Sequence, residues 1–173
     1  RFINYSKIII LQSKIHIQEN LLNQIVTKLL ETKSTVSVAE SCTGGYVSTC
    51  FTSISGASRY FKGGMVLYCD DVKNRFLNIP FSDIESYGVV SQNVVELMAD
   101  NIRKKYKTTF GLATTGYVDY LIDEENHSFN LNAWVSVSTI NFVKSKHVVL
   151  SKGRFENISL VSEVLLRLFR KEI

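Results

Sequence analysis

The sequence has no hydrophobic run long enough to cross a membrane. Its apolar stretch Ile8-Ile9-Ile10-Leu11 is far shorter than the roughly 20 residues that a spanning helix requires. No secretory signal of basic, then apolar, then small residues stands at the start of the chain. We therefore expect a cytoplasmic protein without a membrane partner. The chain begins with Arg instead of Met, so a targeting peptide that has been removed is the alternative.

Cysteine and histidine are scarce, with three of each. They are Cys42, Cys50 and Cys69, and His16, His127 and His147. An odd number of cysteines without C-x-x-C spacing argues against a disulfide framework and favours a reducing compartment. The histidines are dispersed and have no cysteine partners at zinc-site spacing. We therefore expect no metal site, and histidines that are exposed or partly buried.

The chain also lacks a large excess of charge of one sign. It carries 20 Lys and Arg against 16 Asp and Glu, a formal net charge of +4, and these residues are scattered. A nucleic-acid-binding domain usually concentrates basic residues on one face, so we expect no nucleic-acid partner. With 173 residues, 45% of them hydrophobic, the chain can form one domain with a sizeable core. We expect that domain over residues 15–173, preceded by an aperiodic arm at residues 1–14.

Hydrophobic periodicity predicts helices and strands that alternate along most of the chain. Apolar pairs recur every four residues from Leu21 to Leu30 and mark a helix over residues 18–32. The other expected helices cover residues 46–54, run from a cap at Asp70 or Asp71 to Ile79-Pro80, start at Ser91 as N-cap, and cover 156–171. The expected strands are 35–40, 63–68, 108–115, 133–140 and 143–150, with a polar, acidic loop at 117–130. This order predicts a three-layer α/β/α sandwich whose sheet is mostly parallel with one antiparallel strand.

The segment Ser41-Cys42-Thr43-Gly44-Gly45 joins an expected strand to an expected helix. A hydroxyl at a helix N-terminus stands where unpaired N–H groups and the dipole favour negative charge. Ser41 is therefore a candidate nucleophile, with the backbone N–H groups of Thr43 to Gly45 as an oxyanion hole. Alternatively, Ser41 only caps the helix and the glycines allow close packing. Cys42 is either a nucleophile or small core filler.

Other polar residues follow the expected strands at the same sheet edge. In α/β sheets the binding crevice lies beyond the carboxyl ends of the parallel strands. Ser41, Tyr68 and Thr115-Gly116 each end or follow such a strand, and Lys73 follows Tyr68 by five residues. A desolvated lysine can act as a base and a tyrosine can relay a proton, so Ser41, Tyr68 and Lys73 can work without histidine. Alternatively, Tyr68 is a core aromatic and Lys73 a solvated helix residue.

These residues resemble a known family. Ala39-Glu40-Ser41-Cys42-Thr43-Gly44-Gly45 matches the A-E-S-C-T-G-G signature of the CinA C-terminal domain, the nicotinamide-nucleotide amidohydrolase family. Val66-Leu67-Tyr68 through Lys73 is similar to its V-x-Y-s-n-x-x-K pattern, and Tyr87 to Ser91 is similar to h-G-A-V-S. Arg154 to Ile158 resembles an R-x-x-N-I stretch. The resemblance runs in order over about residues 18 to 172.

The resemblance implies hydrolysis of the carboxamide of nicotinamide mononucleotide to nicotinate mononucleotide and ammonia. Ser41 would be the nucleophile, and Tyr68 and Lys73 would activate it, with the base left unassigned between them. The substrate-binding residues would be Thr43, Gly44, Gly45, Thr115, Gly116 and Arg154. Arg154 is a candidate phosphate partner or, equally, part of a surface ion pair. The resemblance implies a pyridine-nucleotide substrate, no metal or organic cofactor, a homodimer, and a stand-alone form without the fused N-terminal domain.

The chain departs from the family pattern in residues 117–132. The family continues T-G-I-A-G-P into a glycine-rich loop, whereas Tyr117-Val118-Asp119-Tyr120 and an acidic stretch stand here. Acidic side chains repel the phosphate that backbone N–H groups would attract; they are Asp119, Asp123, Glu124 and Glu125. Two alternatives to the deamidase therefore remain: an inactive homologue that binds a nucleotide or a protein, and an amidase for a carboxamide without phosphate.

Overall fold

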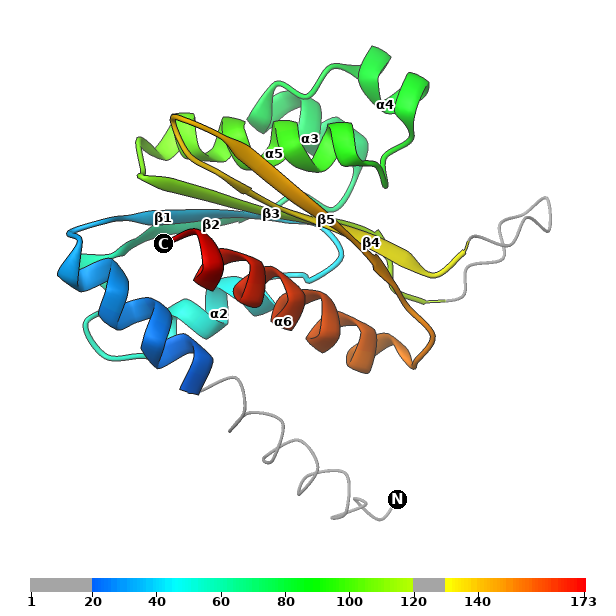
Figure 1. The fold of residues 1–173 in the computed structure, drawn as a ribbon. Coiled ribbons are helices and arrows are strands. Elements are labelled where there is room, and N and C mark those ends of the chain that lie inside the picture. The colour runs from blue at the N-terminus through cyan, green and yellow to red at the C-terminus, as the bar shows by residue number, and fades with distance from the viewer. Residues whose placement is uncertain (1–19, 120–129) are drawn as a thin grey trace, which may run out of the picture.

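The computed structural model describes residues 20–119 and 130–173, which build a five-stranded sheet in the order β2-β1-β3-β4-β5 (Figure 1). The strands are β1 (Val36–Glu40), β2 (Phe61–Val66), β3 (Phe110–Tyr117), β4 (Asn132–Ser138) and β5 (Val143–Val149). Strand β1 pairs in parallel with β2 and β3, whereas β4 pairs antiparallel with β3 and β5. Strand β4 therefore runs against the other strands, which confirms a mostly parallel sheet with one antiparallel strand.

Helices cover both faces of this sheet (Figure 1). The helix of residues 20–31, α2 (Tyr46–Thr52) and α6 (Arg154–Glu172) lie on one face. The other face carries α3 (Asp70–Leu77), α4 (Phe81–Tyr87) and α5 (Gln92–Tyr106). Each helical layer shares a separate apolar core with the sheet, one around Phe51, Leu165 and Phe169 and the other around Met98 and Ile102. The predicted three-layer sandwich is confirmed.

The predicted ends of several elements differ from the observed ends by a few residues, and one helix of the structure was not predicted. The strand expected over residues 63–68 is β2 at Phe61–Val66, so Tyr68 lies beyond its end. Ser91 is the N-cap of α5 as predicted, since its side chain accepts a hydrogen bond from the Val94 N–H at 3.3 Å. Helix α4 was not predicted, because its seven residues are too few to show an apolar period.

The predicted capping of α3 by Asp70 or Asp71 is wrong. The N-cap of this helix is Cys69, and no side chain bonds the first N–H groups there. Asp70 and Asp71 instead stand inside the first turn, where carboxylates interact favourably with the helix dipole. The side chain of Asp70 is thereby placed beside that of Lys73, three residues further along the helix.

Some predicted segments fall outside the described residues, namely the arm at residues 1–14 and residues 120–129 of the acidic loop. Tyr117, the first residue of that expected loop, is the last residue of β3.

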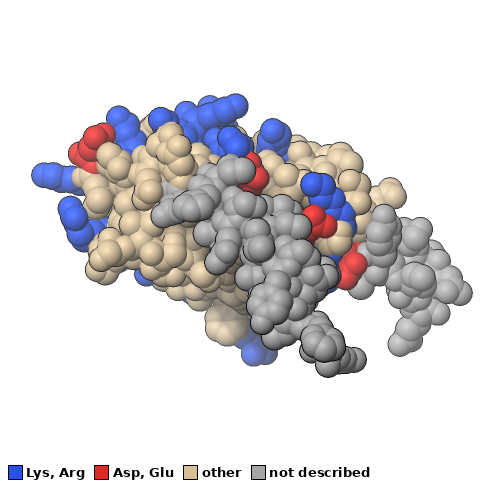
Figure 2. All heavy atoms as spheres, turned by 90° about the horizontal axis from the view of Figure 1, so that it is seen from below, with Lys and Arg blue, Asp and Glu red and all other residues tan. Residues whose placement is uncertain are grey.

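Within the described ranges, no helix is long and apolar enough to cross a membrane. On the face drawn in Figure 2, lysine and arginine side chains form several separate groups, some of them beside acidic side chains.

Candidate functional site

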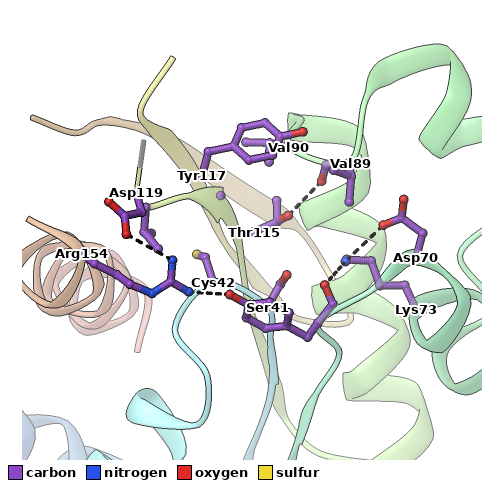
Figure 3. Close-up of a pocket in the computed structure, with 13 residues that line it drawn as sticks. Ser41, Cys42, Asp70, Lys73, Val89, Val90, Thr115, Tyr117, Asp119 and Arg154 are labelled. Atoms are coloured by element: carbon purple, nitrogen blue, oxygen red, sulfur yellow. Dashed lines mark hydrogen bonds and ion pairs between the residues drawn. The ribbon is translucent and has the colours of Figure 1, made fainter. Parts of the chain in front are cut away.

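A pocket of about 210 Å³ opens at the sheet edge where the parallel strands end (Figure 3). Its walls come from the segments after β1 and β2, the end of β3, the first turns of α3 and the start of α6. The lining residues are Ser41, Cys42, Tyr68, Asp70, Lys73, Val89, Val90, Thr115, Gly116, Tyr117, Val118, Asp119 and Arg154. The structure thus brings together the predicted Ser41, Tyr68, Lys73, Thr115, Gly116 and Arg154. The predicted Thr43, Gly44 and Gly45 are not part of the lining.

Ser41 follows β1 directly, in the middle of the parallel part of the sheet. Its N–H donates to the carbonyl oxygen of Thr114 on β3 at 3.1 Å, which fixes the backbone at the strand end. The residue is 7% exposed, and its hydroxyl makes no hydrogen bond with another described residue. The Ser41 hydroxyl therefore stands in the pocket without a protein acceptor in the described ranges.

Glu40, which the sequence reasoning passed over, organises the turn that follows β1. Its side chain is fully buried, and its carboxylate accepts hydrogen bonds from the N–H groups of Gly45, Val47 and Ser48 at 3.0, 3.0 and 2.8 Å. It also accepts from the hydroxyls of Thr43 at 2.7 Å and Ser48 at 2.6 Å. A buried carboxylate thus binds the first N–H groups of α2, which satisfies donors that would otherwise be unpaired.

This arrangement corrects two predictions about Ser41. The N-cap of α2 is Gly45, which adopts the left-handed conformation with φ 98°, so Ser41 is not a helix cap. Nor are the N–H groups at the helix N-terminus free to act on the Ser41 hydroxyl, because those of Gly45, Val47 and Ser48 already donate to the Glu40 carboxylate. The helix dipole is therefore compensated by Glu40 before any charge develops on Ser41.

The predicted oxyanion hole is only partly available. The N–H of Gly44 donates to the Ser41 carbonyl oxygen at 3.2 Å, and the N–H of Gly45 donates to Glu40. Of the predicted amides, that of Thr43 alone has no acceptor among the described residues. The Gly44 and Gly45 amides therefore do not offer free donors to a substrate in this conformation.

Lys73 is buried in the wall of the pocket, at 1% exposure, so its interpretation as a solvated helix residue is wrong. Its Nζ lies 3.5 Å from both the Tyr68 carbonyl oxygen and Asp70 Oδ1. Burial lowers the pKa of the Lys73 amine from its ordinary value, and the Asp70 carboxylate opposes that change. A lysine with a lowered pKa can serve as a proton acceptor near neutral pH.

Arg154 lies on the side of the pocket opposite Lys73 (Figure 3), and it contacts Tyr68. Tyr68 is 59% exposed, so it is not a core aromatic. Its hydroxyl accepts a hydrogen bond of 2.6 Å from Nη2 of Arg154, and Nη1 of Arg154 lies 3.8 Å from Asp119 Oδ2. Arg154 therefore forms the predicted ion pair and also stands where a bound anion could reach it. Asp119 is the described part of the acidic segment; Asp123, Glu124 and Glu125 lie outside the described residues.

The end of β3 forms one wall of the pocket. The Thr115 hydroxyl donates to the Val89 carbonyl oxygen at 2.8 Å, which joins β3 to the segment before α5 (Figure 3). At Gly116 a Cβ would lie 2.5 Å from the Cβ of Ala133 on β4, so the close approach of the two strands requires glycine there. Burial, and then the charge of Asp70, raises the pKa of the Tyr117 hydroxyl.

Cys42 lines the pocket but does not have the features of a reactive thiol. It is buried, and burial raises its pKa to about 12, so the thiolate is scarce near neutral pH. All three cysteines are free, and Cys69 is the exposed one. In the described ranges, no group of three or more His, Cys, Asp or Glu side chains has a metal-binding arrangement. Ser41 is therefore the stronger nucleophile candidate at this turn.

Sequence comparison relates the chain to CinA-like proteins. A CinA-like protein of Amoebophilus asiaticus is 36% identical over 153 residues, which cover 88% of this chain and 36% of that protein. A putative competence-damage inducible protein of Thermoanaerobacter pseudethanolicus is 44% identical over 101 residues, 58% of this chain and 24% of that protein. The chain therefore spans only about a third, or less, of the length of these curated relatives.

Solved structures of the CinA superfamily share the fold. A superfamily protein from Escherichia coli has a TM-score of 0.82 at 21% identity, covering 89% of this chain and 90% of that chain. The competence/damage inducible protein CihA from Agrobacterium tumefaciens has a TM-score of 0.81 at 25% identity, covering 87% and 92%. The model of the CinA C-terminal domain matches residues 18–173, which include every described element. The chain belongs to the CinA C-terminal domain family.

Proposed function

We propose that this domain is an amidohydrolase that converts nicotinamide mononucleotide to nicotinate mononucleotide and ammonia, with Ser41 as nucleophile. The observation that carries the proposal is the burial of Lys73, at 1% exposure, in the wall of the pocket that Ser41 lines. A buried amine whose pKa is lowered is suited to accept a proton from a serine hydroxyl. Membership of the CinA C-terminal domain family supports this chemistry, because the resemblance stated above implies nicotinamide-nucleotide amidohydrolysis.

In the proposed reaction, the neutral amine of Lys73 takes the proton of the Ser41 hydroxyl as Oγ bonds to the carboxamide carbon. The resulting ammonium returns the proton to the leaving nitrogen, the C–N bond breaks and ammonia departs, leaving an ester on Ser41. Water, deprotonated by the same amine, then attacks the ester carbon. The ammonium gives its proton to Ser41 Oγ as the acyl C–O bond breaks, and the acid product ionises to the carboxylate. Lys73 is thus assigned as the base, because the Tyr68 hydroxyl is bound to Arg154.

Two groups are assigned to the remaining charges, one in the turn after β1 and one in the pocket lining. The Thr43 N–H, which has no acceptor among the described residues, is the candidate donor for the oxyanion. Arg154, 46% exposed at the pocket edge, is the candidate partner for the phosphate. The resemblance also implies a homodimer, and this stays a prediction.

Ammonia release tests the proposal. The wild-type domain and Ser41→Ala are compared with nicotinamide mononucleotide as substrate, and Ser82→Ala, an exposed serine on α4, serves as the matched control. Removing a nucleophile typically lowers kcat by about a thousandfold or more, so we expect that loss for Ser41→Ala and none for the control. If wild type releases no more ammonia than Ser41→Ala, the deamidase assignment fails.

One observation favours a second candidate, an amidase for a carboxamide without phosphate. Asp119 lies 3.8 Å from Arg154 and also lines the pocket, so a carboxylate stands beside the cation assigned to the phosphate. Like charges repel, which weakens binding of a phosphate there. Comparing turnover of nicotinamide riboside with that of the mononucleotide decides between the two substrates, since the second candidate predicts faster turnover of the nucleoside.

A further inference from the structure

Asp70 is the acidic side chain that stands beside the buried amine of the pocket. The two residues are three positions apart on α3 and so share a face of the helix. Asp70 Oδ1 lies 3.5 Å from the Nζ of Lys73, and Asp70 is 45% exposed while Lys73 is 1% exposed. We propose that Asp70 is a positioning residue for Lys73, which holds the amine in the pocket and sets the pH range in which it can accept a proton. The proposal rests on the proposed function, in which Lys73 is the base.

Several other groups approach Lys73 or line the same pocket. From α3 and the segment before it, the Tyr68 carbonyl oxygen and the Cys69 thiol approach the amine. From the turn after β1, Cys42 approaches, and its thiol has a pKa of about 12. From β3, Tyr117 interacts with Asp70, and its pKa is raised. Across the pocket, Arg154 and Asp119 are paired with each other (Figure 3). Among the described residues, Asp70 is therefore the carboxylate that pairs directly with Lys73.

Burial and Asp70 act on Lys73 in opposite directions. Burial disfavours the ammonium form and lowers the pKa of the amine, whereas a carboxylate at 3.5 Å favours the ammonium form and raises it. Below the pKa of Lys73 the amine is protonated and cannot act as a base, so activity falls as pH falls. When the charge of Asp70 is removed, the amine of Lys73 stays neutral to lower pH. Activity then also persists to lower pH.

The variants Asp70→Asn and Asp71→Asn form a matched pair. Asparagine at position 70 keeps the size of the side chain and an oxygen that accepts from Nζ, but it removes the charge. Asp71→Asn removes one carboxylate from the same first turn of α3, and Asp71 pairs with Arg75 at 3.5 Å instead of Lys73. Each change removes one carboxylate from the first turn of the helix, so a shift of the Lys73 titration seen only in Asp70→Asn reports on the contact with Lys73. Asp70→Glu restores the charge.

The first experiment is the pH profile of kcat/KM for nicotinamide mononucleotide. A facing charge at this distance shifts a titration by about one unit when half exposed, so we expect the acidic limb of Asp70→Asn to move about one pH unit lower. On that limb, Asp70→Asn is then about tenfold faster than wild type. Asp71→Asn and Asp70→Glu keep the acidic limb of the wild-type protein. An unmoved limb in Asp70→Asn overturns the proposal.

A second experiment does not depend on turnover. The ¹³Cε resonance of Lys73 is identified by its loss in Lys73→Met and titrated by NMR in Ser41→Ala, with and without Asp70→Asn. We expect the titration midpoint of Lys73 to fall when Asp70 is replaced, and not to change with Asp71→Asn. If the midpoint falls but no variant releases ammonia, the influence of Asp70 on Lys73 stands and the proposed function fails. If the midpoint does not move, the proposal about Asp70 is wrong.

Discussion

Replacing Glu40 by glutamine tests how far the turn after β1 depends on one buried carboxylate. Oε2 accepts from the Thr43 hydroxyl and from the Gly45 and Val47 N–H groups, and Oε1 accepts from the N–H and hydroxyl of Ser48. Glutamine keeps one oxygen but places an NH₂ group against at least one backbone N–H, whichever way it turns. An unsatisfied buried donor costs about 1–3 kcal/mol, and hydrogen bonds to a charged group are stronger than neutral ones. We therefore expect Glu40→Gln to lower the free energy of unfolding by about 2–4 kcal/mol.

Urea denaturation measures this change as a lower midpoint at an unchanged slope. The matched control is Glu163→Gln, because Glu163 pairs with Arg167 at 2.8 Å on the outer side of α6, where an ion pair contributes only about 0.5 kcal/mol. We also expect Glu40→Gln to lower kcat for ammonia release, since the carboxylate fixes the turn that presents Ser41. A Glu40→Gln protein within about 0.5 kcal/mol of wild type would refute the idea that the carboxylate charge holds this turn.

Two further predictions concern the rest of the pocket. Burial raises the pKa of Cys42 to about 12, so its thiol stays protonated near neutral pH. Cys42→Ala should therefore keep ammonia release within about threefold of wild type. A loss as large as that of Ser41→Ala would instead identify the cysteine as the nucleophile. Asp119→Asn removes the carboxylate 3.8 Å from Arg154 and should raise kcat/KM for the mononucleotide about two- to fivefold at low salt, with little change for nicotinamide riboside. Equal changes for the two substrates would contradict a role of Asp119 at the phosphate.

The layers of the fold follow from local sequence patterns, and so they were predictable. The apolar stripe from Leu22 to Leu29 is one buried face of a helix, and Ser91 caps α5 as its residue type suggests. Alternating helices and strands require a parallel sheet with covered faces, which the paired β1 and β3 show. Helix α4 was not predictable in this way, since its length is about two turns and Ile84 is its one buried residue.

The site was predictable in its members and much less so in their contacts. The rule that ligands bind beyond the ends of parallel strands correctly grouped Ser41, Tyr68 and Thr115. The pairing of Arg154 with Tyr68 joins positions 86 residues apart, and no local pattern encodes such a contact. Glu40 was overlooked because the alternation of a strand does not tell which polar residue at its end turns inward.

The position of Glu40 changes what the proposed chemistry requires of the other residues. A helix N-terminus stabilises negative charge because its first N–H groups are unpaired, but in α2 those of Val47 and Ser48 are bound to a carboxylate. The same carboxylate adds a negative charge one residue from Ser41, which opposes a serine alkoxide. Ser41 therefore cannot be activated by the helix dipole, and its proton has to be removed as Oγ attacks. Lys73 is the group in the pocket suited to that step, because burial disfavours the protonated form of its amine and lowers its pKa. In the proposed reaction, Glu40 shapes the turn and Lys73 moves the proton, so we expect the pH dependence of that reaction to be a property of Lys73 and Asp70.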